Sequence, residues 1–203
     1  MTQKRITRRH ALVLTAATAL VMPAIVKADA PYKKRLNLQS LNSGEKVNLV
    51  YWADGDYIPG ARKEIDRFMR DLRTNERTEM HTDLLDLLHE IAKASGSATP
   101  IYVMSAFRSA STNAYLSAHS DGVDPSSFHM RGMAVDITQD FSDPGKTYRI
   151  AKKLGIGGSG FYPVARPFVH VDVGPVDTWV HPEHGRLDRA EEYDRMQKEA
   201  EKS

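Results

Sequence analysis

Two short segments of this chain carry side chains of the kinds that bind metal ions. In the first segment, His129 and Asp136 stand seven residues apart, with Gly132 between them. In the second, His170 and Asp172 are two residues apart within an apolar run typical of a strand. Imidazole and carboxylate groups are ligands that zinc accepts in proteins. Together the segments indicate a His/Asp/His metal site with one open position, as in zinc hydrolases.

The strands expected to carry these residues present them on one surface. Side chains alternate between the two faces of a strand. In the run 133–138, Asp136 lies on the face opposite a valine and an isoleucine. In the run 168–173, His170 and Asp172 lie on the face opposite three valines. Each strand therefore combines a polar face with an apolar underside, and the polar faces can surround one cation.

The chain contains no cysteine. Disulfide bonds, thiolate zinc sites and cysteine nucleophiles are therefore excluded. Any bound metal must be held by His, Asp and Glu.

The hydrophobic periodicity of the remaining chain predicts an α+β domain. We expect strands over 36–41, 47–52, 101–105, 133–138 and 168–173, and helices over 61–72, 83–94, 111–119 and 143–155. The glycine-rich stretch 157–160 is interpreted as a flexible turn. His89 lies among the leucines of the second helix, which favours a structural or exposed position over a ligand role. Because strands and helices do not alternate regularly, the pattern favours α+β over a doubly wound fold.

The first thirty residues have the features of a secretory signal peptide. Lysine and arginine residues open the chain, Ala11 to Ile25 is apolar, and Ala28-Asp29-Ala30 offers a cleavage site. The apolar run is too short to span a membrane. The adjacent arginines Arg8 and Arg9 indicate a twin-arginine signal, with an ordinary secretory signal as the alternative. We therefore expect a periplasmic protein with no stable membrane insertion after signal cleavage.

Charge argues against a nucleic-acid partner. Five of the 28 basic residues and one of the 26 acidic residues lie within residues 1–30, so the remainder holds 23 basic and 25 acidic residues. No basic run of the kind that follows a phosphate backbone is present after the signal. Residues 185–203 are charged and poor in apolar residues, and we interpret them as an exposed tail. The expected functional domain is residues 31–184.

Three segments resemble one family. Residues 105–109, 127–136 and 160–174 resemble the murein endopeptidase K family, within the larger group of zinc D-Ala-D-Ala peptidases. The resemblance covers roughly residues 36–180. It implies a small antiparallel sheet with helices packed on one face, a zinc ion in the groove of the sheet, and peptidoglycan peptides as substrate.

The resemblance also implies roles for individual residues. His129, Asp136 and His170 match the zinc ligands of the family, and Arg108 matches the arginine that faces the substrate. Arg108 would stabilise the oxyanion or pair with a substrate carboxylate, for which a planar guanidinium is suited. A structural salt bridge is the alternative role for Arg108.

The general base is the one point where this chain departs from the family pattern. The D-Ala-D-Ala carboxypeptidase and dipeptidase relatives use an acidic residue three positions before the last histidine, where this chain has Pro167. Asp172 is the expected substitute because it shares a face with His170. The alternative for Asp172 is to orient His170 or another ligand from behind, and His119 and His181 are weaker candidates for the base.

These observations predict an exported zinc metallopeptidase that cuts peptide cross-links of peptidoglycan through attack by a zinc-bound water. One alternative is a D,D- or L,D-carboxypeptidase acting on stem peptides. Another is a zinc-dependent peptidoglycan-binding module without catalysis, which the proline at the base position favours. The sequence leaves open whether the cross-link joins D-Ala to diaminopimelate or two diaminopimelate residues.

Overall fold

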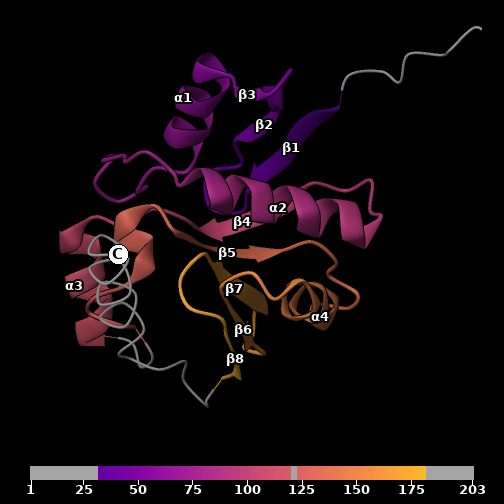
Figure 1. The fold of residues 1–203 in the computed structure, drawn as a ribbon. Coiled ribbons are helices and arrows are strands. Elements are labelled where there is room, and N and C mark those ends of the chain that lie inside the picture. Colours follow the sequence, from indigo (N-terminus) through magenta and orange to yellow (C-terminus); the bar gives the residue numbers. More distant parts are fainter. Residues whose placement is uncertain (1–31, 120–122, 182–203) are drawn as a thin grey trace, which may run out of the picture. The chain divides into compact units, whose positions relative to one another are not determined.

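A mixed β-sheet with helices around it forms the described part of the chain. The computed structural model describes residues 32–119 and 123–181. The predicted signal peptide and the predicted charged tail lie outside these residues. Within the described residues, one eight-stranded sheet and four α-helices make up the α+β fold that the sequence predicts (Figure 1).

The strands of the sheet are short, and most were visible in the sequence pattern. They are β1 Lys33–Ser40, β2 Lys46–Ala53, β3 Asp56–Tyr57, β4 Ile101–Ser105, β5 Ala134–Thr138, β6 Gly158–Tyr162, β7 Phe168–Asp172 and β8 Asp177–Val180. Their order across the sheet is β3-β2-β1-β4-β5-β7-β6-β8.

The expectation of an antiparallel sheet is wrong, because the sheet is mixed. β1 pairs with β4 in parallel, and β6 pairs with β8 in parallel, while the other neighbours are antiparallel. A parallel pair needs a crossover connection rather than a hairpin. Two helices lie between β1 and β4 in the chain, and β7 lies between β6 and β8. Both parallel pairs therefore have the long connections that they need.

Three of the four helices in the described residues pack against the apolar face of the sheet. The helices are α1 Pro59–Phe68, α2 Thr82–Ser95, α3 Ala110–His119 and α4 Gly145–Leu154. The α2 leucines pack in one core cluster with α1, α4 and the apolar residues of β1, β2, β4, β5 and β7. In Figure 1, α1 lies by β2 and α4 lies by β6 and β7, as their contacts also show. No helix within the described residues is long and apolar enough to cross a bilayer.

The glycine-rich stretch 157–160 is a strand rather than a flexible turn. Residues 158–162 form β6, which pairs with both β7 and β8. Gly160 is needed there because the Trp179 indole lies directly above it, and a Cβ on Gly160 would come within 2.2 Å of the ring. Glycine has low strand propensity on its own, so tertiary packing overrides the local signal here.

The opposite face of the sheet carries a row of polar and aromatic residues. The register places Ser105, Asp136, His170, Gly160 and Trp179 side by side on β4, β5, β7, β6 and β8. Residues paired across strands share a face, so this row forms one continuous surface. Two of the three predicted metal ligands lie at its centre.

Candidate metal centre

His129 reaches the sheet from a short 3-10 turn. The turn Phe128–Arg131 begins at Ser127, whose hydroxyl accepts the backbone N–H of His129, and ends at Gly132. Gly132 has a φ of 66°, and a Cβ there would lie 2.6 Å from the carbonyl oxygen of Glu79. The neighbouring segment therefore requires glycine at this position. The close packing of Gly132 against this segment fixes the turn that holds the His129 ring.

The orientation of the His129 ring decides which nitrogen is available. His129 Nδ1 lies 2.6 Å from the carbonyl oxygen of Ala106, and a carbonyl can only accept a hydrogen bond. Nδ1 must therefore carry the proton, which leaves a lone pair on Nε2. His129 is buried, and burial together with the Arg108 charge lowers the pKa of its ring to about 4. The ring is therefore neutral at pH 7, as a metal ligand must be.

His170 is oriented by a carboxylate behind it. Its Nε2 lies 3.0 Å from Asp172 Oδ2, and its Nδ1 faces Asp136 Oδ1 at 3.0 Å. When Nε2–H donates to Asp172, the neutral ring keeps its lone pair on Nδ1. Burial alone lowers the pKa of His170, but the two carboxylates outweigh burial and raise this pKa above its ordinary value.

Asp136 divides its two oxygens between the cluster and an arginine. Oδ1 faces both histidines, and Oδ2 accepts a hydrogen bond from Arg108 Nη2 at 2.7 Å. Burial alone raises the pKa of Asp136. The two histidines at Oδ1 and the positive guanidinium of Arg108 at Oδ2 outweigh burial and hold this pKa well below the ordinary range. Asp136 is therefore an anion throughout the physiological pH range.

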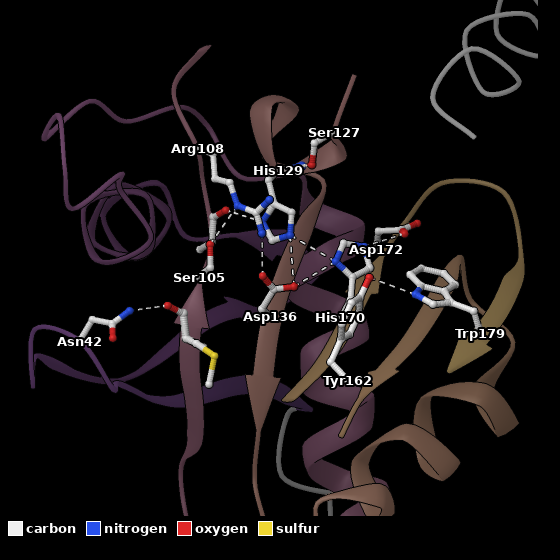
Figure 2. Close-up of polar contacts among 12 residues, drawn as sticks. Asn42, Ser105, Arg108, Ser127, His129, Asp136, Tyr162, His170, Asp172 and Trp179 are labelled. Atoms are coloured by element: carbon white, nitrogen blue, oxygen red, sulfur yellow. Dashed lines mark hydrogen bonds and ion pairs between the residues drawn. The ribbon is translucent and has the colours of Figure 1, made fainter. Parts of the chain in front are cut away.

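The lone pairs of these three side chains therefore converge on one point. Figure 2 shows His129, Asp136 and His170 pointing toward one another. His129 Nε2 lies 3.2 Å from His170 Nδ1 and 3.2 Å from Asp136 Oδ1, and the last pair is 3.0 Å apart. A tetrahedral ion with bonds of ~2.0 Å separates its ligand atoms by roughly 3.3 Å. Three acceptors this close repel one another unless a metal ion or a proton lies among them. The geometry and the donor set both fit a metal ion, and these residues form the metal-ligand cluster found among the described residues.

Asp172 lies behind His170 and not beside the converging atoms. Its side chain is fully buried. Asp172 Oδ1 accepts the backbone N–H groups of Gly158 and Gly174 at 3.0 and 2.8 Å, while Oδ2 contacts His170 Nε2. This is the arrangement of a carboxylate that orients a metal-binding histidine.

Arg108 lies directly next to the cluster. Nη2 contacts Asp136, and Nε donates to Ser105 Oγ at 3.2 Å. The side chain also lines a pocket of about 450 Å³ that Asp136 borders. Arg108 therefore forms a salt bridge, as in the structural role considered for it. It also borders a pocket, as a substrate-facing arginine would.

The other histidines of residues 32–119 and 123–181 lie outside the cluster. His119, at the end of α3, contacts the Tyr115 carbonyl oxygen and stacks on the Tyr115 ring. His181 stacks on Tyr162. His89 contacts the Arg35 carbonyl oxygen and the Tyr32 hydroxyl, which agrees with the structural or exposed position predicted for it.

Sequence reasoning missed the groups that fix the two imidazole rings. The Ala106 carbonyl is a backbone group, so no residue type signals it. Trp179 packs with its ring centre 5.5 Å from that of His170, and its Nε1–H donates to the Tyr162 hydroxyl. Only the β6–β8 pairing brings Trp179 to this position, and the sequence pattern did not predict that pairing.

A buried carboxylate joins the two loops that border the pocket. Asp71 Oδ1 accepts the backbone N–H of Arg73 at 2.8 Å, and Oδ2 accepts the N–H and hydroxyl of Ser109, both at 2.8 Å. Burial alone raises the pKa of Asp71, but hydrogen bonds from Thr112, Ser109 and Arg73 outweigh it and lower the pKa to about 2. Asp71 therefore fixes the segment after α1 to the segment after Arg108.

A sheet face carrying a buried His/Asp/His cluster with oriented rings beside a pocket defines a metallohydrolase-type centre. Comparisons with known proteins identify the family. A family model described as peptidoglycan L,D-endopeptidase MepK matches residues 28–179, a range that contains the whole cluster. The chain belongs to this family of M15-type metallopeptidases.

Curated relatives cover nearly the same length. The peptidoglycan L,D-endopeptidase MepK of Escherichia coli K12 is 30% identical over 167 residues, which span 82% of this chain and 91% of the relative. A probable peptidoglycan L,D-endopeptidase MepK of Haemophilus influenzae is 34% identical over 162 residues, spanning 78% of this chain and 87% of the relative. No solved structure matches the chain significantly.

The role of Asp71 predicts a pH-dependent loss of stability. In Asp71→Asn, the amide N–H₂ replaces one of the two accepting oxygens and must face an N–H donor. The negative charge that strengthens the remaining hydrogen bonds is also lost. We expect the free energy of unfolding at pH 7 to fall by about 2 kcal/mol. Because the folded-state pKa is lowered, the wild-type advantage is complete above pH ~4 and shrinks as the pH falls towards 2.

Urea unfolding of wild type and Asp71→Asn between pH 3 and pH 7 measures this difference in the free energy of unfolding. Asp56→Asn, a change at an exposed aspartate, is the control. A difference between wild type and Asp71→Asn that is the same at pH 3 and pH 7 would show that the charge of Asp71 does not contribute.

Proposed function

We propose that this protein is an exported zinc endopeptidase that hydrolyses peptide cross-links of peptidoglycan. The observation that carries the proposal is the convergence of His129 Nε2, His170 Nδ1 and Asp136 Oδ1, with both ring orientations fixed from behind. The family supports the substrate class, since the matching relatives are named peptidoglycan L,D-endopeptidases.

Zinc is the metal that this donor set favours. Two imidazole nitrogens and one carboxylate oxygen form a three-ligand set with an open position, as in catalytic zinc sites. Magnesium and calcium prefer oxygen ligands only. When bound, zinc supplies a Lewis acid that polarises a carbonyl and generates a nucleophile from water near neutral pH.

The chain's own residues hold and polarise the substrate. Arg108 lines the pocket with its guanidinium beside Asp136, so it is positioned to stabilise negative charge on the oxygen of a scissile carbonyl. Asp136 stays anionic and keeps Arg108 in place. Asp172 holds the Nε2 proton of His170, so that the Nδ1 lone pair remains directed at the metal position. We therefore assign Asp172 the orienting role rather than that of the general base.

The cross-link cut is proposed to be the L,D type. An amide between two diaminopimelate residues joins an L centre to a D centre, and the names of the matching relatives specify L,D cleavage. The features of residues 1–30 support export by the twin-arginine route to the periplasm, where this substrate lies.

A zinc-dependent binding module is the second candidate. Pro167 occupies the position of the usual acidic base, and both oxygens of Asp172 are already hydrogen bonded. A protein that retains zinc and binds sacculi but releases no new amines would have this function.

Digestion of purified murein sacculi tests the endopeptidase directly. We expect the zinc-loaded protein to convert cross-linked muropeptide dimers to monomers, and the diaminopimelate–diaminopimelate dimers to disappear first. Removal of the metal with a chelator should stop the reaction, and added zinc should restore it. Chromatography of the muropeptides measures both effects, and persistence of every dimer with zinc present refutes the proposal.

Loss of any one ligand should abolish zinc retention. We expect His129→Ala, Asp136→Ala and His170→Ala each to lose bound zinc and activity, because each removes one of three ligands. The fold should survive, since the apolar face of β5 and β7 is unchanged. Metal analysis and circular dichroism measure these outcomes, with His119→Ala as the control that keeps zinc. Full zinc occupancy in a ligand variant would remove that residue from the set.

Asp172→Asn separates the two roles considered for Asp172. An amide cannot accept from both His170 and the two backbone N–H groups, so one donor must face another donor. We expect zinc affinity to weaken by ~10-fold or more. A general base would give a different result, with normal zinc affinity and turnover lowered by ~100-fold or more. Metal titration and turnover on one preparation distinguish these outcomes.

A further inference from the structure

The pocket beside the metal centre extends well beyond the three ligands. Asp136 and Arg108 border it on one side, and Arg70 and Arg73, which follow α1, border it on another. Three arginines therefore line one pocket. Two carboxylates also line it: Asp71 accepts several hydrogen bonds, and Asp136 accepts one from Arg108 and faces the two histidines.

Two of these arginines are occupied by partners within the protein. Arg70 contacts both carboxylate oxygens of Glu45, at 2.9 and 3.3 Å, and also the Asn75 side chain at 2.9 Å. Arg108 contacts Asp136 and Ser105. Their guanidinium groups have structural partners before any substrate binds.

Arg73 differs from both. Among residues 32–119 and 123–181, no carboxylate forms an ion pair with its guanidinium, which instead lies over the Tyr115 ring at 5.3 Å from the ring centre. Tyr115 is itself 51% exposed. A guanidinium stacked on an aromatic ring keeps its N–H donors free at its edge.

The backbone of Arg73 is held in place although its side chain is exposed. Its N–H donates to Asp71 Oδ1, and the other oxygen of Asp71 holds Ser109, the residue after Arg108. One buried carboxylate thus sets the spacing between the segments that carry Arg73 and Arg108. A guanidinium carried by a fixed backbone segment beside the pocket is suited to recognising a charge on an extended substrate.

We propose that Arg73 binds a free carboxylate of the peptide substrate and thereby sets a preference for cross-links flanked by an unmodified acid. This inference rests on the proposed function. A diaminopimelate residue in a cross-link keeps a carboxylate near the scissile amide, and a planar guanidinium matches a carboxylate with two parallel hydrogen bonds. An amidated carboxylate lacks the charge and one acceptor.

Two cross-linked muropeptides that differ only at this carboxylate test the proposal. One carries the free acid and the other the amide, and kcat/KM is measured for both with zinc-loaded wild type, Arg73→Gln and Arg77→Gln. Arg77 is an exposed arginine of the same segment that does not line the pocket. We expect wild type and Arg77→Gln to prefer the acid by ~10-fold or more. Arg73→Gln should cleave both peptides at the wild-type rate for the amide.

Arg73→Gln that keeps the acid preference, or that slows both peptides by the same factor, overturns the proposal. If wild type cleaves neither peptide, the proposed function fails, and the Arg73 assignment is then decided by equilibrium binding of the same two peptides to zinc-loaded protein. Tighter binding of the acid form by wild type but not by Arg73→Gln supports the assignment. Equal binding of the two forms by wild type refutes it.

Discussion

The candidate metal centre depends on two hydrogen bonds that determine where two imidazole protons lie. The Ala106 carbonyl requires a proton on His129 Nδ1, and Asp172 favours one on His170 Nε2. Only this combination leaves both remaining lone pairs facing Asp136 Oδ1. If either ring adopted its other tautomer, an N–H group would point into the cluster and exclude a cation. The backbone that positions Ala106 and Asp172 is therefore as necessary to the site as the ligands.

The sheet converts these local requirements into a single surface. Asp136 and His170 are direct neighbours in the β5–β7 register, and Gly160 follows on β6, where the absence of a side chain admits the Trp179 indole against His170. Gly132 plays the corresponding part for His129, because only glycine fits beside the Glu79 carbonyl. Both glycines lie where the backbone or a large ring approaches closely, so their role is steric.

The sequence allowed the face of each strand to be predicted, since alternation is a local property. Asp136 and His170 do lie on the polar face above buried valines, and the structure brings them to His129. The mixed sheet was not predictable in this way, because parallel pairing depends on how long connections return. The interpretation of residues 157–160 as a turn failed for a related reason, since Gly160 leaves room for Trp179, which lies far along the chain. The hydrogen-bond partners of Asp172 and the residues that line the pocket with Arg73 could not be predicted from the sequence, because they depend on the positions of atoms from distant segments.

The central claim is that zinc binds between His129 Nε2, His170 Nδ1 and Asp136 Oδ1, with Asp172 outside the ligand set. A crystal structure of the zinc-loaded protein, with anomalous diffraction recorded on both sides of the zinc absorption edge, locates the ion directly. The account predicts one strong peak within ~2.0–2.2 Å of these three atoms, with Asp172 still on His170 Nε2. A peak coordinated by His170 Nε2 or by Asp172, or no peak at the cluster, would contradict it.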